Sequence, residues 1–292
     1  MKMTFLNKTS SLARLMSSSA VIEHYGKGGN LLKTITEALG KTGLSENITI
    51  DQLAPMDEFH IGGLEATKDF VRQLNICETH KVLDIGCGLG GPARFVASCF
   101  GSKVTGVDLT PEFVTCGNEL TKMVGLSNKV ELLTGSALDL DSVLTEERGL
   151  YDRAYMLHVG MNIKDKSLLV SQMAAKLRPG GLIGIYDVMK CGKNESEDLD
   201  YPVPWTSSKE NDFAAYPEDY RNAIELAGLK LIAERNRFDF AVEFFARMSD
   251  KKTPPIIGLH LLMNEFPQKM KNMVKNLKLQ RISPIEMIAE KP

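Results

Sequence analysis

A glycine-rich turn between two apolar segments most constrains how this chain can fold. Residues 81–94 read Lys-Val-Leu-Asp-Ile-Gly-Cys-Gly-Leu-Gly-Gly-Pro-Ala-Arg. Val82, Leu83 and Ile85 are typical of a buried parallel strand, and the apolar spacing after Pro92 predicts a helix. Glycines permit positive φ and let a ligand approach the backbone, while the first N–H groups of the helix point to the same crevice. We therefore expect a flat or anionic ligand at this turn.

An acid just before the glycines indicates which ligand the turn binds. Gly86, Gly88 and Gly91 fit the spacing of a dinucleotide fingerprint, which is a weak pattern on its own. Asp84, however, stands two residues before Gly86, and Gly90 completes the form Asp-x-Gly-x-Gly-x-Gly. A carboxylate at this strand end suits a ligand with an amino group and is unfavourable beside a pyrophosphate. In this form the turn resembles that of class I S-adenosylmethionine (SAM)-dependent methyltransferases.

Strands and helices alternate along the chain after the turn. Their periods predict strands at 103–108, 129–134, 151–157, 182–187, 229–235 and 283–290, and helices at 111–124, 164–177 and 217–227. The sequence Leu-Arg-Pro-Gly-Gly just before the fifth strand is a second signature that resembles class I methyltransferases. The resemblance implies an α/β fold, with a Rossmann-like seven-stranded sheet, helices on both faces and an antiparallel last strand.

The ends of the second and third strands supply the next candidate cofactor contacts. Asp108 ends the second strand, about 20 residues after the turn, at the distance where a carboxylate reaches a ribose in such folds. Leu109 follows it, and capping of the next helix is the alternative role of Asp108. Many class I methyltransferases have a sequence that resembles Gly-Asp-Ala after the third strand, and its acid binds the adenine. Here Ser136 and Ala137 stand in that place, with Asp139 as the alternative contact.

Two histidines are candidates for a general base. His158 directly follows the fourth strand, at the edge of an open parallel sheet where ligands bind. His60 lies in the segment Asp-Glu-Phe-His-Ile-Gly-Gly of residues 57–63, which precedes the first strand. An imidazole can take the proton of an acceptor as it is methylated. Ordinary core or surface roles are the alternative for both.

An irregular stretch at about 189–216 interrupts the alternation of strands and helices. Irregular chain of such length inside a compact domain is usually functional or disordered. Tyr201 and Trp205 flank two prolines there, which predicts a stiff lid over the acceptor. The alternative is a surface segment whose aromatic side chains only pack on the sheet. Tyr25, near the N-terminus, and Tyr186, at the end of the fifth strand, are further candidates for substrate binding.

The resemblance implies a function as well as a fold. Among class I enzymes the chain is most similar to sarcosine and dimethylglycine N-methyltransferases, which implies SAM as the cofactor and a small-molecule amine as the acceptor. A carbon or oxygen acceptor on a quinone-like ring is the alternative within methyl transfer. A nicotinamide-dependent oxidoreductase that uses the same glycines, or a SAM-binding protein without activity, are alternatives from other classes.

Composition narrows the classes of partner. The net charge of −2, with no run of lysine and arginine interleaved with aromatics, gives no support for nucleic-acid binding. No apolar run approaches the roughly 20 residues of a membrane span. The five cysteines form no CxxC pair, which argues against a zinc site and a disulfide framework. We therefore expect a small-molecule partner, no metal and a reducing compartment; the oligomeric state is not indicated.

The chain divides into three predicted parts. Residues 1–20 contain Lys2, Lys8 and Arg14 but no acid, which is typical of a mitochondrial transit peptide; a disordered tail on a cytoplasmic protein is the alternative. Residues 21–78 form a predicted helical cover over the cofactor and acceptor. Residues 79–292 form the SAM-binding domain, with the lid at about 189–216 and a helical cap at about 240–280.

Overall fold

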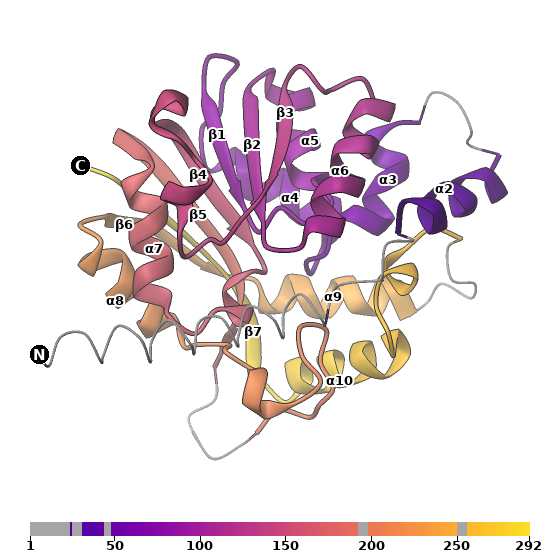
Figure 1. Ribbon diagram of the computed structural model, residues 1–292. Coiled ribbons are helices and arrows are strands. Elements are labelled where there is room, and N and C mark those ends of the chain that lie inside the picture. The colour runs from indigo at the N-terminus through magenta and orange to yellow at the C-terminus, as the bar shows by residue number, and fades with distance from the viewer. Residues whose placement is uncertain (1–23, 25–30, 44–47, 192–197, 250–255) are drawn as a thin grey trace, which may run out of the picture.

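One seven-stranded sheet organises the protein (Figure 1). The computed structural model describes residue 24 and residues 31–43, 48–191, 198–249 and 256–292. The strand order is β3-β2-β1-β4-β5-β7-β6, and only β7 runs antiparallel to its neighbours. The strands are β1 (Lys81–Ile85), β2 (Lys103–Asp108), β3 (Val130–Thr134), β4 (Tyr151–Leu157), β5 (Leu177–Lys190), β6 (Lys230–Asn236) and β7 (Ile282–Glu290). The predicted fold class and antiparallel last strand are confirmed.

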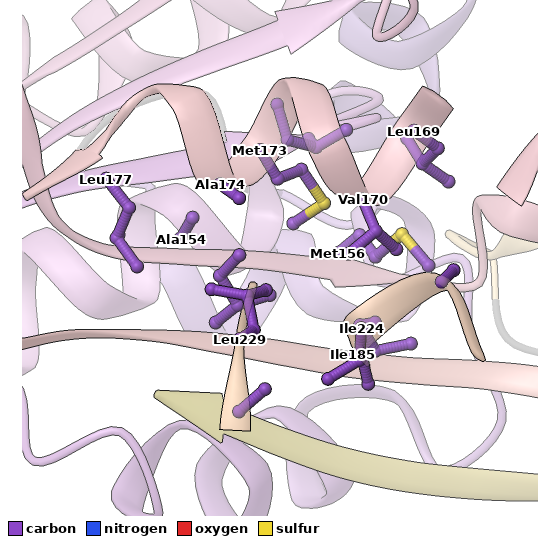
Figure 2. Packing of buried hydrophobic residues seen from close by; sticks show 14 of the residues in the cluster. Ala154, Met156, Leu169, Val170, Met173, Ala174, Leu177, Ile185, Ile224 and Leu229 are labelled. Atoms are coloured by element: carbon purple, nitrogen blue, oxygen red, sulfur yellow. The ribbon is translucent and has the colours of Figure 1, made fainter. Parts of the chain in front are cut away.

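Helices cover both faces of this sheet. On one face, side chains of α4 (Gly63–Arg72) and α5 (Gly91–Phe100) pack against Val82 and Tyr155. On the other face, α7 (Lys166–Ala175) and α8 (Pro217–Leu226) pack against Met156 and Ile185, as Figure 2 shows. A further helix, α6 (Pro111–Met123), lies against β2 and β3. Alternate residues of each strand therefore face two different cores, as parallel strands covered on both sides require.

The strand β5 is longer than its apolar pattern predicted. It includes the Arg-Pro-Gly-Gly sequence at its start and extends to Lys190, where the pairing with β7 begins at Ile282. Lys190 and Met189 are thus part of the sheet and not of an irregular lid. The reason is that β7 offers a complete antiparallel partner, so pairing continues after the buried apolar run has ended.

Segments from the two ends of the chain meet beside the sheet. The N-terminal part contributes α2 (Leu31–Lys41) and α3 (Ile50–Asp57), and the C-terminal part contributes α9 (Phe238–Ser249) and α10 (Phe266–Lys278). The short helix Leu259–Leu261 contacts α3, and α9 and α10 contact each other beneath the sheet in the view of Figure 1. No helix in the described ranges is long and apolar enough to span a bilayer. The predicted leader lies outside the described residues, and the division into parts stays a prediction.

A buried ion pair fastens the N-terminal cover to the helix after the glycine turn. Arg94 of α5 donates to Asp57 at the end of α3 over 2.6 Å, and neither side chain is exposed. The same guanidinium also donates to Gly117 O and to Thr121 Oγ1 of α6. A Cβ at Gly91 would lie 2.5 Å from Asp57 O, so only glycine allows this approach. The pair fixes where α3 ends and where the next residues lie.

Breaking this pair should destabilise the protein far more than breaking a surface pair. We expect Arg94→Ala to lower the free energy of unfolding by about 3–5 kcal/mol, because Asp57 is left buried without its partner. Arg148→Ala, which removes a surface pair with Glu131, should cost at most about 1 kcal/mol. Urea unfolding followed by circular dichroism measures both changes. Equal losses in the two variants would contradict this role of the buried pair.

Candidate functional site

A large cavity opens at the carboxyl edge of the sheet, between the cover and the cap. Its volume is about 2450 Å³. Most residues predicted for the site line it, namely Gly86, Gly88, Asp108, Leu109, Ser136, Ala137, His60, His158 and Trp205. Four others, Asp84, Gly90, Tyr186 and Tyr201, are not among its lining residues, and Tyr25 lies outside the described part of the chain. The structure therefore brings the cofactor and base candidates into one space.

The glycine turn is tightly held against β2 and β4. Gly86, Gly88 and Gly90 all have positive φ, of 68°, 53° and 80°. A Cβ at Gly86 would lie 2.4 Å from a methyl group of Val159, so a side chain there would be strained and would clash. The N–H of Gly86 donates to Val107 O over 2.7 Å. The turn thus presents bare backbone to the cavity at Gly86 and Gly88.

Asp108 bonds to the backbone on both sides of the strand end. Its Oδ2 accepts from Gly88 N over 2.9 Å, and its Oδ1 accepts from the N–H of Thr110, the residue before α6, over 2.8 Å. It therefore ties β2 to the glycine turn and holds the start of the segment that enters α6, while its contact with a ribose stays a prediction. Because each carboxylate oxygen has a second acceptor site and Asp108 lines the cavity, it can still receive a ligand hydroxyl.

Asp84 lies buried under the turn, beside Tyr155 of β4. The two residues are register partners across β1 and β4, and Asp84 is 1% exposed. Burial raises the pKa of Asp84 to about 8; the Tyr155 hydroxyl opposes this shift, and the charge of Asp108 adds to it. Asp84 Oδ2 has no hydrogen-bond partner among the residues the structure describes. A buried acid without a partner favours a cationic group nearby.

The end of β3 forms the border predicted for an adenine. Ser136 Oγ accepts from Leu138 N over 3.1 Å, which shapes the turn after the strand. Ser136, Ala137 and Leu138 line the cavity. Asp139, the alternative contact, is exposed and does not line it. The border is therefore mostly apolar, as a flat ring requires, and Ser136 is its polar group.

The two predicted bases lie together and are uncharged at neutral pH. Their ring centroids are 5.9 Å apart, and the ring of Tyr186 lies 4.9 Å from that of His158. Burial lowers the pKa of His60 to about 4, and burial together with His60 lowers the pKa of His158 well below 6.5. His158 has a φ of 55°, and its buried Nε2 has no partner in the described chain. Both imidazoles can therefore accept a hydrogen bond.

The aromatic candidates for substrate binding separate into two groups. Tyr186 donates to Ile61 O over 2.9 Å and so joins the cover to β5. Tyr201 and Trp205 both donate to the carboxylate of Asp212, each over 2.9 Å. Only Trp205 lines the cavity, with its indole nitrogen directed to Asp212. The hydroxyls of the two tyrosines are thus satisfied by the chain itself, and neither tyrosine lines the cavity.

The apolar wall opposite the turn was not predicted as part of the site. It comes mainly from the cap, which the pattern of buried apolar residues indicated only as core. The methionines and phenylalanines that line it are Met161, Met248, Met263, Met270, Met273, Phe244, Phe245 and Phe266. Phe59, on the cover, lies 3.5 Å from the place a Cβ would take at Gly88. Apolar spacing is the same for a core and for a cavity wall, so no signal separated the two.

Comparison with known proteins finds similarity over the residues that form this site. The family described as "Methyltransferase domain" matches residues 82–181, which include the glycine turn, Asp108 and His158. Phosphoethanolamine N-methyltransferase 1 of Arabidopsis thaliana is 29% identical over 190 residues, covering 65% of this chain and 37% of that protein. The chain therefore spans little more than a third of that relative's length.

Solved structures show the same fold. Geranyl diphosphate C-methyltransferase of Streptomyces coelicolor A3(2) gives a TM-score of 0.66 at 14% identity, over 94% of this chain and 98% of that one. A protein described as a sarcosine dimethylglycine methyltransferase of Galdieria sulphuraria gives 0.58 at 19% identity, over 78% and 85%. The resemblance to class I methyltransferases is confirmed. Residues 82–181 thus match a methyltransferase domain, and the chain has the strand order and Rossmann-like fold of the class I enzymes.

Proposed function

We propose that this protein is a SAM-dependent methyltransferase that acts on a small molecule bound in the cavity. The observation that carries this proposal is the pair of acids at the turn, Asp84 buried without a partner for its Oδ2 and Asp108 bonded to Gly88. A cationic amino acid group and a ribose are complementary to these two carboxylates. The pyrophosphate of a dinucleotide would instead meet two acidic side chains and no cationic one at the turn, so a nicotinamide cofactor has less support.

The residues of the chain fit this cofactor in three places. The amino group would lie near Asp84, the ribose hydroxyls near Asp108, and the adenine beside Leu109, Ser136 and Ala137. When bound, SAM supplies a methyl group on a positively charged sulfur. The protein must then hold an acceptor atom in line with that methyl group and exclude water. The close cover at Phe59 and His60 is suited to both tasks.

The wall formed by the cap favours an acceptor with a large apolar body. Methionine side chains are flexible and adapt to irregular apolar ligands. Small-molecule sites are mostly apolar, with a few polar groups that set orientation. That wall and the two uncharged histidines line the same cavity. The quinone-like acceptor that the sequence left as the alternative therefore fits this lining better than a small charged amine.

An amine acceptor is a second candidate, supported by a different observation. Trp205 lines the cavity, and an indole face attracts a methylated ammonium by about 0.5–2 kcal/mol. The Arabidopsis thaliana relative is named for the amine phosphoethanolamine. Sarcosine and dimethylglycine thus stay in the acceptor set to be tested.

Removing the ribose contact should weaken SAM binding. We expect Asp108→Ala to lower the binding free energy of SAM by about 1.5–3 kcal/mol, because a hydrogen bond to a charged group is lost. Asp139→Ala, an exposed acid beyond the cavity lining, is the matched control and should leave the dissociation constant unchanged. Isothermal titration calorimetry measures both, with NADH as a competing ligand. An unchanged constant in Asp108→Ala, or tighter binding of NADH than of SAM, would count against the proposal.

SAM binding should also depend on pH through Asp84. Its pKa is raised to about 8 by burial, so much of the free protein is protonated there at neutral pH. A nearby ammonium group favours the ionised form, so binding below pH 8 releases a proton. The affinity should fall by up to about tenfold per unit as the pH is lowered from 8 to 6.

Calorimetry in two buffers of different ionisation enthalpy measures this proton release. Asp84→Asn cannot ionise and should bind SAM more weakly at pH 8, with little change in affinity between pH 8 and pH 6. If the unaltered protein releases no proton on binding SAM, Asp84 does not contact the amino group.

The nature of the acceptor can be tested with methyl-labelled SAM. We expect phenols or quinols with alkyl tails to be methylated, with kcat/KM rising about fourfold per added methylene while the wall is being covered, since each buried methylene contributes about 0.8 kcal/mol. Mass spectrometry identifies the labelled products. A higher kcat/KM for sarcosine or dimethylglycine than for every alkylated ring would show that the acceptor is an amine.

A further inference from the structure

A buried hydrogen-bonded chain lies behind His60, away from the glycine turn. Thr67 of α4 donates to Glu58 Oε2 over 2.7 Å, and the same hydroxyl lies 3.0 Å from His60 Nε2. His60 Nε2 also lies 3.0 Å from Gly63 O. Thr67 is fully buried, and Glu58 is 3% exposed.

The partners of His60 determine which of its nitrogens carries the proton. A backbone carbonyl only accepts, so the contact with Gly63 O requires a proton on Nε2. Thr67 gives its own hydrogen to Glu58, which leaves its oxygen free to accept from the same Nε2. A neutral imidazole has one proton, so Nδ1 is left as a bare acceptor. Nδ1 makes no hydrogen bond within the described chain.

Glu58 can fix which group donates in each hydrogen bond of this buried network. Its Oε2 accepts from Thr67, while Oε1 is buried without a partner among the described residues. Burial, with the charge of Asp57 adding to it, raises the pKa of Glu58 well above its usual range, whereas the Thr67 bond opposes the shift. A proton on Oε1 leaves Oε2 free to accept. Thr67 is then always the donor to Glu58 and the acceptor for His60.

We infer that Glu58 and Thr67 are positioning residues that fix the tautomer of His60, so that Nδ1 is the nitrogen presented to the acceptor. The catalytic meaning of this inference rests on the proposed methyl transfer, whereas the tautomer itself does not. His60 lines the cavity, as does Glu58. An acceptor with an N–H or O–H on its reacting atom would donate that hydrogen to Nδ1 and be held in place by it.

The proton balance of the step follows from this arrangement. As the acceptor atom bonds to the methyl carbon, the carbon–sulfur bond breaks and its electron pair stays on sulfur. The proton of the acceptor passes to His60 Nδ1 and then to water. The low pKa of His60 means that the imidazolium gives the proton up readily, so that the base is restored for the next turnover.

Nuclear magnetic resonance of histidine-labelled protein tests the tautomer directly. With ¹⁵N in the imidazoles, and with His60→Asn used to assign the signals, we expect His60 to show a protonated Nε2 and an unprotonated Nδ1. Thr67→Val keeps the shape but removes one of the two acceptors for the Nε2 hydrogen, so that only Gly63 O still holds it. Part of the protein should then take the tautomer with the proton on Nδ1, with kcat about tenfold lower and SAM affinity unchanged. Thr67→Ser should restore both the spectrum and kcat.

Controls keep this test separate from the proposed function. Ser283→Ala removes another buried hydroxyl, one that donates to Asn236 and has no part in the Arg94–Asp57 pair, and should leave the His60 signals unchanged. If no acceptor is ever methylated, the spectrum still decides the tautomer. A proton on Nδ1 of His60 in the unaltered protein would overturn the inference. So would a tautomer change in Thr67→Val with no fall in kcat, or no change in either.

Discussion

The buried contact between Arg94 and Asp57 is the interaction on which the site depends. It joins the helix that follows the glycine turn to the helix that ends the N-terminal cover. Because Asp57 is fixed, the next three residues must pass over the turn, which places Phe59 near Gly88 and His60 beside His158. A buried pair of this kind is costly to form and contributes specificity of position more than net stability. Here that position is the roof of the cavity.

Below Phe59 and His60, burial determines which groups of the site can carry a charge. Asp84 and Asp108 lie at the ends of neighbouring strands, and burial raises the pKa of both, with the charge of Asp108 adding to the shift of Asp84. Burial also keeps the two histidines neutral. A cation on the cofactor would stabilise the ionised acids without charging the imidazoles. The site thus combines acids and neutral imidazoles, which suits a donor with a positive sulfur and an uncharged acceptor.

The sequence was most informative where local rules decide the structure. The glycine turn, the succession of strands and helices and the position of His158 follow from periodicity, turn residues and the edge rule for parallel sheets. The seven-stranded sheet with its antiparallel last strand was implied by the resemblance to class I methyltransferases. Contacts between distant segments did not follow. Arg94 was visible only as part of a motif, because its partner Asp57 lies on a separate helix and depends on the absence of a side chain at Gly91. Likewise, Tyr186 and Tyr201 were suggested as ligand contacts, since a pattern does not show that Ile61 O and Asp212 already satisfy them.

The central claim is that Asp84, Asp108 and the backbone of the glycine turn bind a sulfonium nucleoside. A crystal structure of the protein with S-adenosylhomocysteine tests it most directly, because it locates the amino group, the ribose and the adenine in one experiment. We predict the amino group within reach of Asp84, the ribose hydroxyls on Asp108 and the adenine beside Ala137. Density for a dinucleotide pyrophosphate over Gly86 and Gly88, or a nucleoside bound elsewhere on the protein, would contradict the account.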